Sequence, residues 1–432
     1  MGYVLLILLG IELYIFYNSN GKNIISPSFL GGMMFILSTT IYLSADEYFG
    51  YEIHFVTVLT IIGLLACIFI GERFAERLIV KKQLCKIPSE DSNSRTFIEV
   101  PRWVCLFITI GVLAMSLLHF RTAYLYSLTV GNTAGNVFTM AKYIREASLS
   151  GKGAFELPIL ISQGLVFSEC IVWFCVYSIC NNKNITGKFY YRLLFPIIAY
   201  LPNVWATDNR TSLLRMVAIC FIIVFVFIKQ KHGWTKKGNT KIVFFGVLVI
   251  CLYLVVFRML GYRTETSLRN ELGENLIEYM SASLVGLDKY LLEGEPANTL
   301  FGEGTLKGIY NILRQWGLPI PMVDQFEPFY SYAGGMSNAY TTFKAYIHDY
   351  SIVGAIVAMF LWGAIINYSM KYIRENNVSF VRMCVVGMMF YPVVMLSIAD
   401  STAVFLSMKT VYTLVYLFVI DMILVKKKVN IK

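Results

Sequence analysis

The chain has 432 residues, of which 57% are apolar and only 15% are charged, and its mean hydropathy is +0.61. This composition excludes a soluble globular protein, because too few polar residues remain to cover a soluble surface. The net charge is +10, and the basic residues are spread over six connections. This argues against a nucleic-acid-binding face, so we expect no nucleic acid among the partners.

The apolar residues form long continuous runs, which indicate membrane-spanning helices rather than a β-barrel. We therefore expect an all-α fold, a polytopic membrane helix bundle that makes a single membrane domain of residues 1–432. About 20 apolar residues cross a hydrocarbon core of roughly 30 Å. On this basis we expect about eleven transmembrane helices, at residues 2–17, 25–44, 52–71, 103–120, 157–180, 190–205, 211–228, 242–261, 350–370, 382–399 and 402–425.

Lysine and arginine gather in every second connection, and such connections stay in the cytoplasm. We therefore expect the amino terminus outside, the carboxyl terminus inside, and two long outer loops at residues 121–156 and 262–349. The basic connections also predict membrane lipids as partners, with anionic lipid at the inner face. The basic residues that set this orientation are Lys22, Arg73, Arg77, Lys81, Lys82, Lys86, Arg95, Lys183, Lys188, Lys231, Lys236, Lys237, Lys241, Lys371, Arg374, Lys426, Lys427 and Lys428.

Both outer loops contain apolar residues at helical spacing. In the first loop, Val137, Met140, Ala141 and Ile144 predict a short helix at the membrane interface. In the larger loop, two such patterns predict amphipathic helices that lie over the outer mouth of the bundle. Their apolar residues are Leu272, Leu276, Ile277, Met280, Leu284, Leu287 and Leu291 in the first helix, and Leu306, Ile309, Tyr310 and Leu313 in the second.

Several charged side chains lie within spans, where each needs a partner or a polar cavity. Asp421 is near an inner end and is expected to meet Lys426, whereas Lys409, in mid-span, is expected to face a cavity. Five arginines lie at the outer face, and two readings stay open for them. They reach the outer lipid headgroups, or they converge on a diphosphate, whose oxygens a guanidinium binds in a bidentate way. These arginines are Arg210, Arg215, Arg258, Arg263 and Arg269.

The segment 337–350 runs directly into the ninth expected span. As a helix it places Asn338, Thr342, Ala345 and Asp349 on one face, which makes a polar stripe that descends toward the membrane. In a catalytic reading, Asp349 takes a proton from a hydroxyl group that Asn338 helps to bind. In the alternative reading this is a solvated first turn of helix, capped by Ser337.

Two further residues of this segment are candidates for the same site. His348 is the sequence neighbour of Asp349 but points about 100° away from it on a helix, so a structural role competes with a catalytic one. Tyr340 belongs to a group of aromatic residues that suits either a membrane-interface belt or stacking on sugar rings. The other members of the group are Phe326, Phe329, Tyr330, Tyr332 and Tyr346.

The sequence has none of the common cofactor, nucleotide or metal motifs, among them HExxH, the Walker loop and GxSxG. The four histidines are scattered, and the nine cysteines lie mostly within spans without paired spacing. We therefore expect no cofactor, no bound metal and no disulfide framework.

Five strings taken together resemble the Wzy-type oligosaccharide repeat unit polymerases of bacterial O-antigen, capsule and exopolysaccharide assembly. They occur in order over most of the chain, and the eleven-span layout with one large outer loop agrees with that family. The strings are NIISPSFL (23–30), DNRTSLLRM (208–216), ENLIEYMSASLVGLDKYL (274–291), LFGEGTLKGIYNIL (300–313) and SNAYTTFKAYIHDYSIVG (337–354).

The resemblance implies a GT-C-like glycosyltransferase of the bacterial cytoplasmic membrane. Its substrates would be undecaprenyl-diphosphate-linked oligosaccharides, with a chain-length regulator and a flippase as further conceivable partners. By position, Arg210 and Arg263 match best the family's diphosphate-binding arginines, and Asp349 is the first choice for the base that deprotonates the acceptor hydroxyl. The family's Asp-Phe-Gly appears here as Asp349, Tyr350 and Ser351, a departure that puts a close backbone approach at Ser351 in question.

Two other functions stay open. A flippase for lipid-linked oligosaccharides would need a charged cavity that opens to both faces and internal pseudo-symmetry, whereas the cations gather at one face and no repeat is visible. An O-antigen ligase would transfer the glycan to lipid A or to a protein. A structural scaffold would have no use for arginines inside the membrane.

Overall fold

The computed structural model describes residues 1–83, 97–149, 155–206, 210–232, 271–296, 298–321, 327–375 and 379–425, and four single residues, 240, 242, 244 and 246. The expected eighth span at residues 242–261 therefore lies outside the described residues, apart from three of these single positions. The same holds for Lys426, the expected partner of Asp421.

Eight of the described helices are long and apolar enough to cross a membrane, which confirms a helical, multi-pass membrane protein. A ninth apolar helix, α15 (Phe380–Val394), is shorter. The eight are α1 (Gly2–Ser19), α2 (Pro27–Ser44), α4 (Phe55–Gln83), α5 (Arg102–Thr129), α7 (Ile159–Thr186), α10 (Arg210–His232), α14 (Thr342–Glu375) and α17 (Met408–Ile420), the last extended by the π-helical turn η3 (Asp421–Val425).

The expected sixth span is not one continuous helix. Residues 191–206 form a 3-10 turn, η2 (Tyr191–Leu193), and two short helices, α8 (Leu194–Ala199) and α9 (Leu201–Ala206), which both lie against α5. Pro202 explains the break, because a proline lacks the backbone N–H of a helix interior and its ring clashes with the carbonyl group four residues earlier. It is tolerated here in the first turn of α9.

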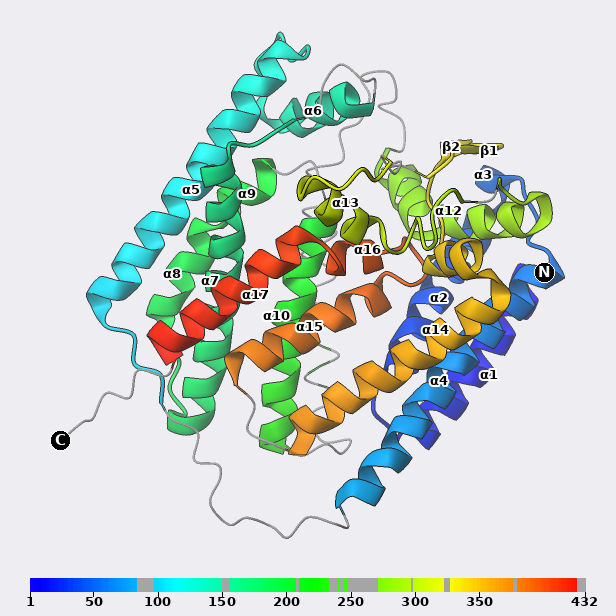
Figure 1. Ribbon diagram of the computed structural model, residues 1–432, viewed down its shortest axis with the longest axis horizontal. Coiled ribbons are helices and arrows are strands. Elements are labelled where there is room, and N and C mark those ends of the chain that lie inside the picture. Colours follow the sequence, from blue (N-terminus) through cyan, green and yellow to red (C-terminus); the bar gives the residue numbers. More distant parts are fainter. Residues whose placement is uncertain are drawn as a thin grey trace.

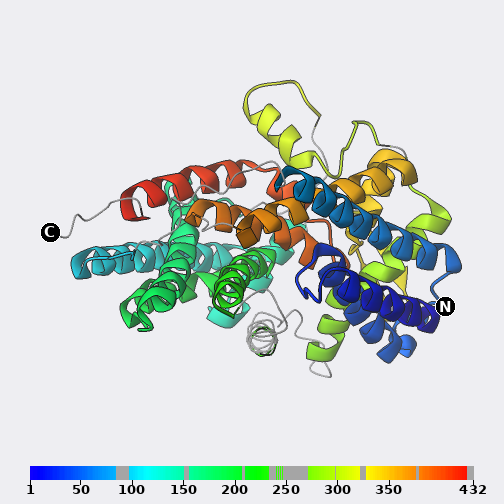
Figure 2. The ribbon, with the colours of Figure 1, turned by 90° about the horizontal axis from the view of Figure 1, so that it is seen from below.

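The helices form two groups that are joined through the middle of the molecule (Figure 1). In one group α1 packs on α2, and α4 packs along α14; in the other, α7 contacts α5, α10 and α17. Figure 2 shows the blue helices α1, α2 and α4 on one side and the cyan and green helices α5 and α7 on the other. The helix α15 joins the groups, because it packs on α10 and also contacts α2 and α14.

Two glycines bring α4 and α14 into direct backbone contact. A Cβ atom on Gly71 would lie 2.0 Å from the carbonyl oxygen of Phe360, and one on Gly363 would lie 2.0 Å from that of Ile68. Neither distance leaves room for a methyl group. This reciprocal pair of small residues therefore fixes the crossing of the two longest helices, as small residues commonly do in membrane bundles.

The described elements of the two loops that are expected to face outward lie at one end of the bundle, the upper end in Figure 1, which we call the capped end. The predicted helices are present as α6 (Met140–Leu149), α12 (Glu271–Glu293) and α13 (Lys307–Gln315). The apolar faces of α6 and α12 are turned inward, because Met140, Ile144, Leu284 and Leu287 are fully buried, whereas the apolar residues of α13 are only partly buried. The first residues of the chain lie at the same end, since a Cβ atom on Gly2 would lie 2.8 Å from the side chain of Leu43 in the last turn of α2.

Two features of the capped end were not predicted. A small antiparallel hairpin, β1 (Tyr330–Tyr332) and β2 (Gly335–Ser337), pairs Tyr330 with Ser337 and rests on the short helix α3 (Asp46–Phe49) through a hydrogen bond from the Ala333 N–H to the Phe49 carbonyl (3.1 Å). The buried carboxylate of Asp288 fastens α12 to the chain before and within α4. It accepts hydrogen bonds from the Tyr51 hydroxyl (2.7 Å), the backbone N–H of His54 (2.7 Å) and the Thr57 hydroxyl (2.6 Å).

Candidate functional site

Three charged side chains from three helices meet inside the bundle. Glu169 on α7 accepts a hydrogen bond from Nη2 of Arg215 on α10 at both carboxylate oxygens, each at 2.9 Å. The Nζ atom of Lys409 on α17 lies 3.3 Å from Oε2 of the same carboxylate. Two cations thus share one carboxylate, which leaves one excess positive charge. We call these residues the Glu169 cluster.

The three members of the cluster differ in what they offer to a ligand. The Arg215 and Glu169 side chains are only 6% and 3% exposed, whereas that of Lys409 is 36% exposed. The Nε atom of Arg215 is buried and has no hydrogen-bond partner among the described residues. The cluster therefore presents Lys409 as its accessible charge, whereas Arg215 is buried with one donor group unused.

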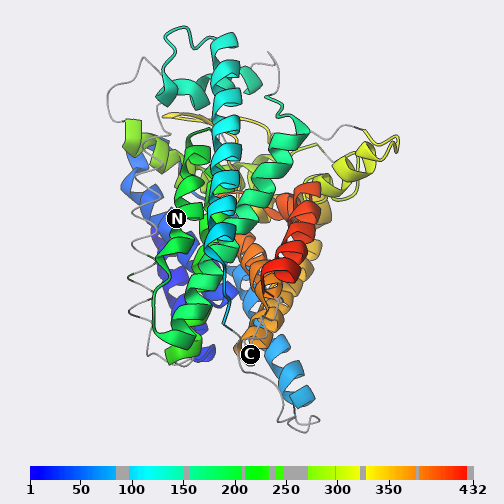
Figure 3. The same ribbon diagram turned by 90° about the vertical axis from the view of Figure 1, so that its left-hand side faces the viewer.

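A half-polar cavity of about 440 Å³ lies beside the cluster, and we call it the Lys409 pocket. This volume is within the range of small-molecule sites, roughly 300–1,000 Å³. Its lining includes Glu169 and Lys409 with His119, Gln163 and Asn203. Gln315, the last residue of α13, also lines it, and this places the pocket at the capped end. In Figure 3 α13 lies close to the upper end of α17, shown in red.

Polar contacts fix the orientation of two further side chains in the pocket. His119 on α5 is buried, and its Nδ1 atom contacts Oδ1 of Asn203 on α9. The Tyr416 hydroxyl donates a hydrogen bond to Oε1 of Gln163 (3.0 Å), which holds the amide of Gln163 next to α17. The pocket is therefore lined by oriented donors and acceptors.

An apolar groove of about 370 Å³ lies between α5, α7 and α17 with its extension η3. Its lining includes Phe107, Met115, Phe167 and Ile423, with Ser168 as the one polar residue. Gly164 of α7 lines it as well, and a Cβ atom at this position would lie 2.6 Å from the sulfur of Met115. The Lys409 pocket and the apolar groove thus use neighbouring faces of one set of helices.

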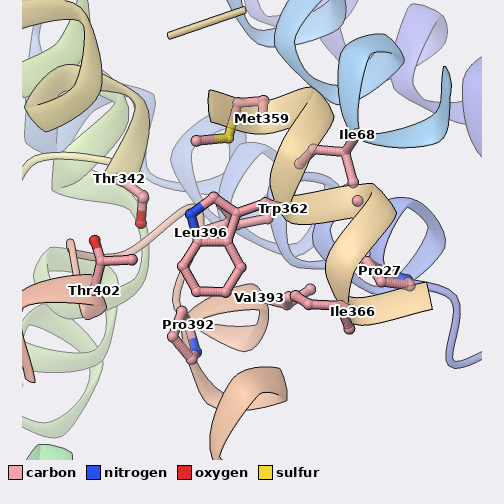
Figure 4. Close-up of a pocket in the computed structure, with 11 residues that line it drawn as sticks. Pro27, Ile68, Thr342, Met359, Trp362, Ile366, Pro392, Val393, Leu396 and Thr402 are labelled. Atoms are coloured by element: carbon pink, nitrogen blue, oxygen red, sulfur yellow. The ribbon is translucent and has the colours of Figure 1, made fainter. Parts of the chain in front are cut away.

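The cavity in Figure 4 is too small to be a ligand site. It measures about 20 Å³, enough for roughly one water molecule, and lies between α4, α14 and α15. The Trp362 ring lies among its lining residues, with Thr342 and Thr402 to one side (Figure 4). The indole N–H of Trp362 donates to the Tyr346 hydroxyl (2.8 Å), so this polar group is satisfied within the protein.

The carboxylate of Asp349 is fully engaged by one loop, residues 298–306. It accepts hydrogen bonds from the Asn298 amide (2.5 Å), the Gly304 N–H (3.1 Å), and both the N–H and the hydroxyl of Thr305 (2.7 Å each). A carboxylate has about four lone-pair positions, so these four donors use its capacity. The neighbouring His348 contacts the Tyr290 hydroxyl through Nδ1 at 3.4 Å.

The polar stripe predicted along 337–350 is only partly present. The helix begins at Thr342, so Asn338 lies in the extended stretch between β2 and α14 and does not share a helical face with Asp349. Ser337 belongs to β2 and does not cap the helix, which corrects that alternative reading. Thr342, another member of the expected stripe, donates a hydrogen bond from its hydroxyl to the carbonyl of Ala399 (3.0 Å).

Tyr340 is buried and belongs to a cage around Lys344. Its ring centre lies 4.7 Å from Nζ of Lys344, which also contacts the carboxylates of Glu295 (2.7 Å) and Glu327 (2.5 Å). Burial, with the two carboxylates nearby, raises the pKa of Tyr340, so its hydroxyl stays protonated and donates to the carbonyl of Pro328 (3.2 Å). This cage ties the outer-loop segments to α14.

The helix α14 contains a break directly after Asp349 and Tyr350. Ser351 has φ 62° and ψ 175°, a conformation that glycine adopts readily and other residues rarely do. The chain keeps the turn in spite of the serine.

The five candidate arginines are described unequally. Arg258, Arg263 and Arg269 lie outside the described residues, and Arg210 is described only as the first backbone position of α10. Arg215 turns inward to Glu169 and not outward to lipid headgroups. Whether all five converge thus stays a prediction, whereas Arg215 and Lys409 do meet.

Sequence reasoning missed Glu169, although a signal was present. Glu169 is a single carboxylate within the apolar run of residues 165–175. A charge inside a span is energetically costly, and this cost had singled out Arg215 and Lys409 in other spans. Within the described ranges, no group of three or more His, Cys, Asp or Glu side chains is placed to hold a metal ion.

The chain matches no protein-family model, no curated protein and no solved structure.

Proposed function

We propose that this protein polymerises undecaprenyl-diphosphate-linked oligosaccharide repeat units on the outer face of the cytoplasmic membrane. The reaction is a glycosyl transfer from the lipid diphosphate to a hydroxyl group of the acceptor repeat unit. The observation that carries the proposal is the Glu169 cluster, with its excess positive charge, beside a half-polar pocket at the capped end.

The cluster suits a diphosphate leaving group. Negative charge grows on the leaving oxygen as the glycosidic bond breaks, and cations that are already oriented in a site of low dielectric stabilise that charge. Lys409 is exposed enough to meet a phosphate oxygen, and Arg215 adds a second, buried positive charge on the same carboxylate. In the absence of substrate, Glu169 compensates one of the two cations, which leaves one positive charge for an anionic ligand.

The apolar groove supports a substrate with a hydrocarbon tail. A diphosphate attached to an isoprenoid chain is anionic at one end and apolar along the rest, and the Lys409 pocket and the groove offer these two environments on the same helices. A soluble nucleotide-sugar would have no use for such a groove. This combination favours a lipid-linked donor over a soluble one.

The base that receives the acceptor proton is better sought in the pocket than at Asp349. The Asp349 carboxylate already accepts four hydrogen bonds, which favours a positioning role over proton transfer. His119 lines the Lys409 pocket, and imidazole is the side chain that exchanges a proton near neutral pH. We therefore take His119 as the first candidate for the base.

Purified protein in liposomes that contain lipid-linked repeat units tests this function. A ladder of longer glycans on the lipid supports polymerisation, and the ladder should be lost with Lys409→Ala and kept with Lys188→Ala, an exposed lysine remote from the cluster. Movement of the lipid across the bilayer without lengthening would replace the proposal by a flippase. Transfer of the glycan only to added lipid A or protein would replace it by a ligase.

A further inference from the structure

The loop of residues 298–306 is attached to α14 through two adjacent residues, Asp349 and Tyr350. Asp349 receives the four hydrogen bonds described above, and the Tyr350 hydroxyl bonds to the Thr305 hydroxyl (2.7 Å). The Phe301 ring packs edge-on against the ring of Tyr350, with 5.1 Å between their centres. Gly302 leaves the space that this contact needs, because a Cβ atom there would lie 2.5 Å from the Tyr350 hydroxyl oxygen.

Hydrogen bonds within the loop hold its residues together as one compact unit. The Glu303 carboxylate accepts hydrogen bonds from the N–H of Thr299 (2.8 Å), the hydroxyl of Thr299 (3.1 Å) and the N–H of Leu300 (3.2 Å). A loop with this internal bonding transmits its position to whatever follows it in the chain.

The helix α13 follows the loop directly and ends at the pocket. It begins at Lys307, two residues after Thr305, and its last residue, Gln315, lines the Lys409 pocket. Between these points α13 contacts the short helix α16 (Thr402–Phe405), which precedes Lys409 in the chain. The chain therefore connects Asp349 to the wall of the pocket through one loop and one short helix.

We propose that Asp349 is a positioning residue that holds α13 as a lid over the Lys409 pocket. Its carboxylate accepts four hydrogen bonds from the 298–306 loop and so holds this loop against the last helical turn before the break in α14. The break at Ser351 ends that first stretch of helix immediately beyond Tyr350. Release of the loop would free the end of α13 and open the pocket toward the capped side. The inference rests on the proposed function only for naming the pocket as the substrate site.

A reporter cysteine inside the pocket measures the opening without any substrate. Met408 lines the pocket and is only partly exposed, so Met408→Cys places a thiol under the lid. The rate at which a membrane-impermeant maleimide labels this thiol in proteoliposomes reports access, with protein lacking the substitution as the background. Asp349→Asn should raise this rate about tenfold, the effect expected when hydrogen bonds to a charged group are lost. Thr305→Val, which removes one donor on the loop side, should raise it less.

Asp46→Asn is the matched control, because Asp46 is an exposed carboxylate at the same end of the bundle. Its labelling rate should equal that of the reporter protein alone. Kinetics add a second readout: a positioning role predicts a higher KM with both Asp349→Asn and Thr305→Val. Unchanged labelling in both variants would overturn the proposal, and a loss of kcat in Asp349→Asn alone would then assign Asp349 as the base. The labelling result stands even if the protein proves not to be a polymerase.

Discussion

Arg215 on α10 donates to both carboxylate oxygens of Glu169 on α7, at 2.9 Å each, and so joins the two helices by a buried ion pair. Such a pair is stable only when both charges remain, because a single buried charge without its partner is strongly destabilising. Lys409 adds a second cation to a carboxylate that is already paired. The pair therefore has a structural role, and the additional cation is the part available for a substrate.

Removal of the carboxylate should destabilise the centre of the bundle. Glu169→Gln leaves Arg215 and Lys409 close together without compensation, and we expect the free energy of unfolding to fall by about 3–5 kcal/mol. Thermal unfolding in detergent measures this loss. Glu52→Gln, an exposed carboxylate at the capped end, is the control and should leave Tm unchanged. An equal Tm for both variants would mean that the ion pair does not stabilise the fold.

Removal of the second cation should lower the activity and leave the stability of the protein unchanged. Lys409→Met keeps the Glu169–Arg215 pair balanced, so Tm should stay close to that of the wild type. Chain extension should fall by roughly 100-fold, the effect typical of losing one group that stabilises a developing negative charge. Rates of glycan lengthening in proteoliposomes measure the loss, with Lys188→Met as the matched lysine control. A variant that extends chains at the normal rate would exclude Lys409 from the site.

The strained backbone at Ser351 predicts a stabilising substitution. Ser351→Gly removes the cost of φ 62° and should raise the free energy of unfolding by about 1 kcal/mol, whereas Ser351→Val should lower it. The matched control is Ser369→Gly, at an ordinary helical position of α14, which should lower stability by about 0.5–1 kcal/mol. Opposite signs for the two glycine variants support the account; a fall in Tm with both would argue against strain at Ser351.

The contact between α4 and α14 predicts a sharp difference between glycines of one helix. Gly71→Ala places a methyl group where a carbonyl oxygen lies at 2.0 Å, so the helices must separate, at a cost of roughly 1–3 kcal/mol or more. Gly63→Ala, on the same helix with open space around it, should have little effect or stabilise slightly. The yield of monodisperse protein and its Tm measure both. Similar behaviour of the two variants would show that the crossing tolerates separation.

The sequence predicted those features that depend on local periodicity. The helices α6, α12 and α13 follow from helical spacing alone, and most spans follow from the length of their apolar runs. The β1–β2 hairpin escaped prediction because strands of three residues carry no readable alternation. The break between α8 and α9 was marked by Pro202, but the apolar composition of the run concealed it.

The candidate site was predicted less well, because its contacts join residues far apart in the chain. Arg215 and Lys409 were recognised as costly charges, but their common partner Glu169 lies 46 residues from the first and on a different helix. Asp349 was placed on a helical face, and its true partners are on a loop 44 to 51 residues away. Spacing along one helix reveals neither kind of contact.

Binding of the lipid itself tests the central claim most directly. Undecaprenyl diphosphate and the uncharged alcohol undecaprenol, each added to the purified protein, separate the anionic contact from the apolar one when bound lipid is counted by native mass spectrometry. We expect the wild type to retain the diphosphate at least about tenfold more tightly than Lys409→Met does, with both proteins equal toward the alcohol. Equal retention of the diphosphate by the two proteins would contradict an anion-binding role for the Glu169 cluster.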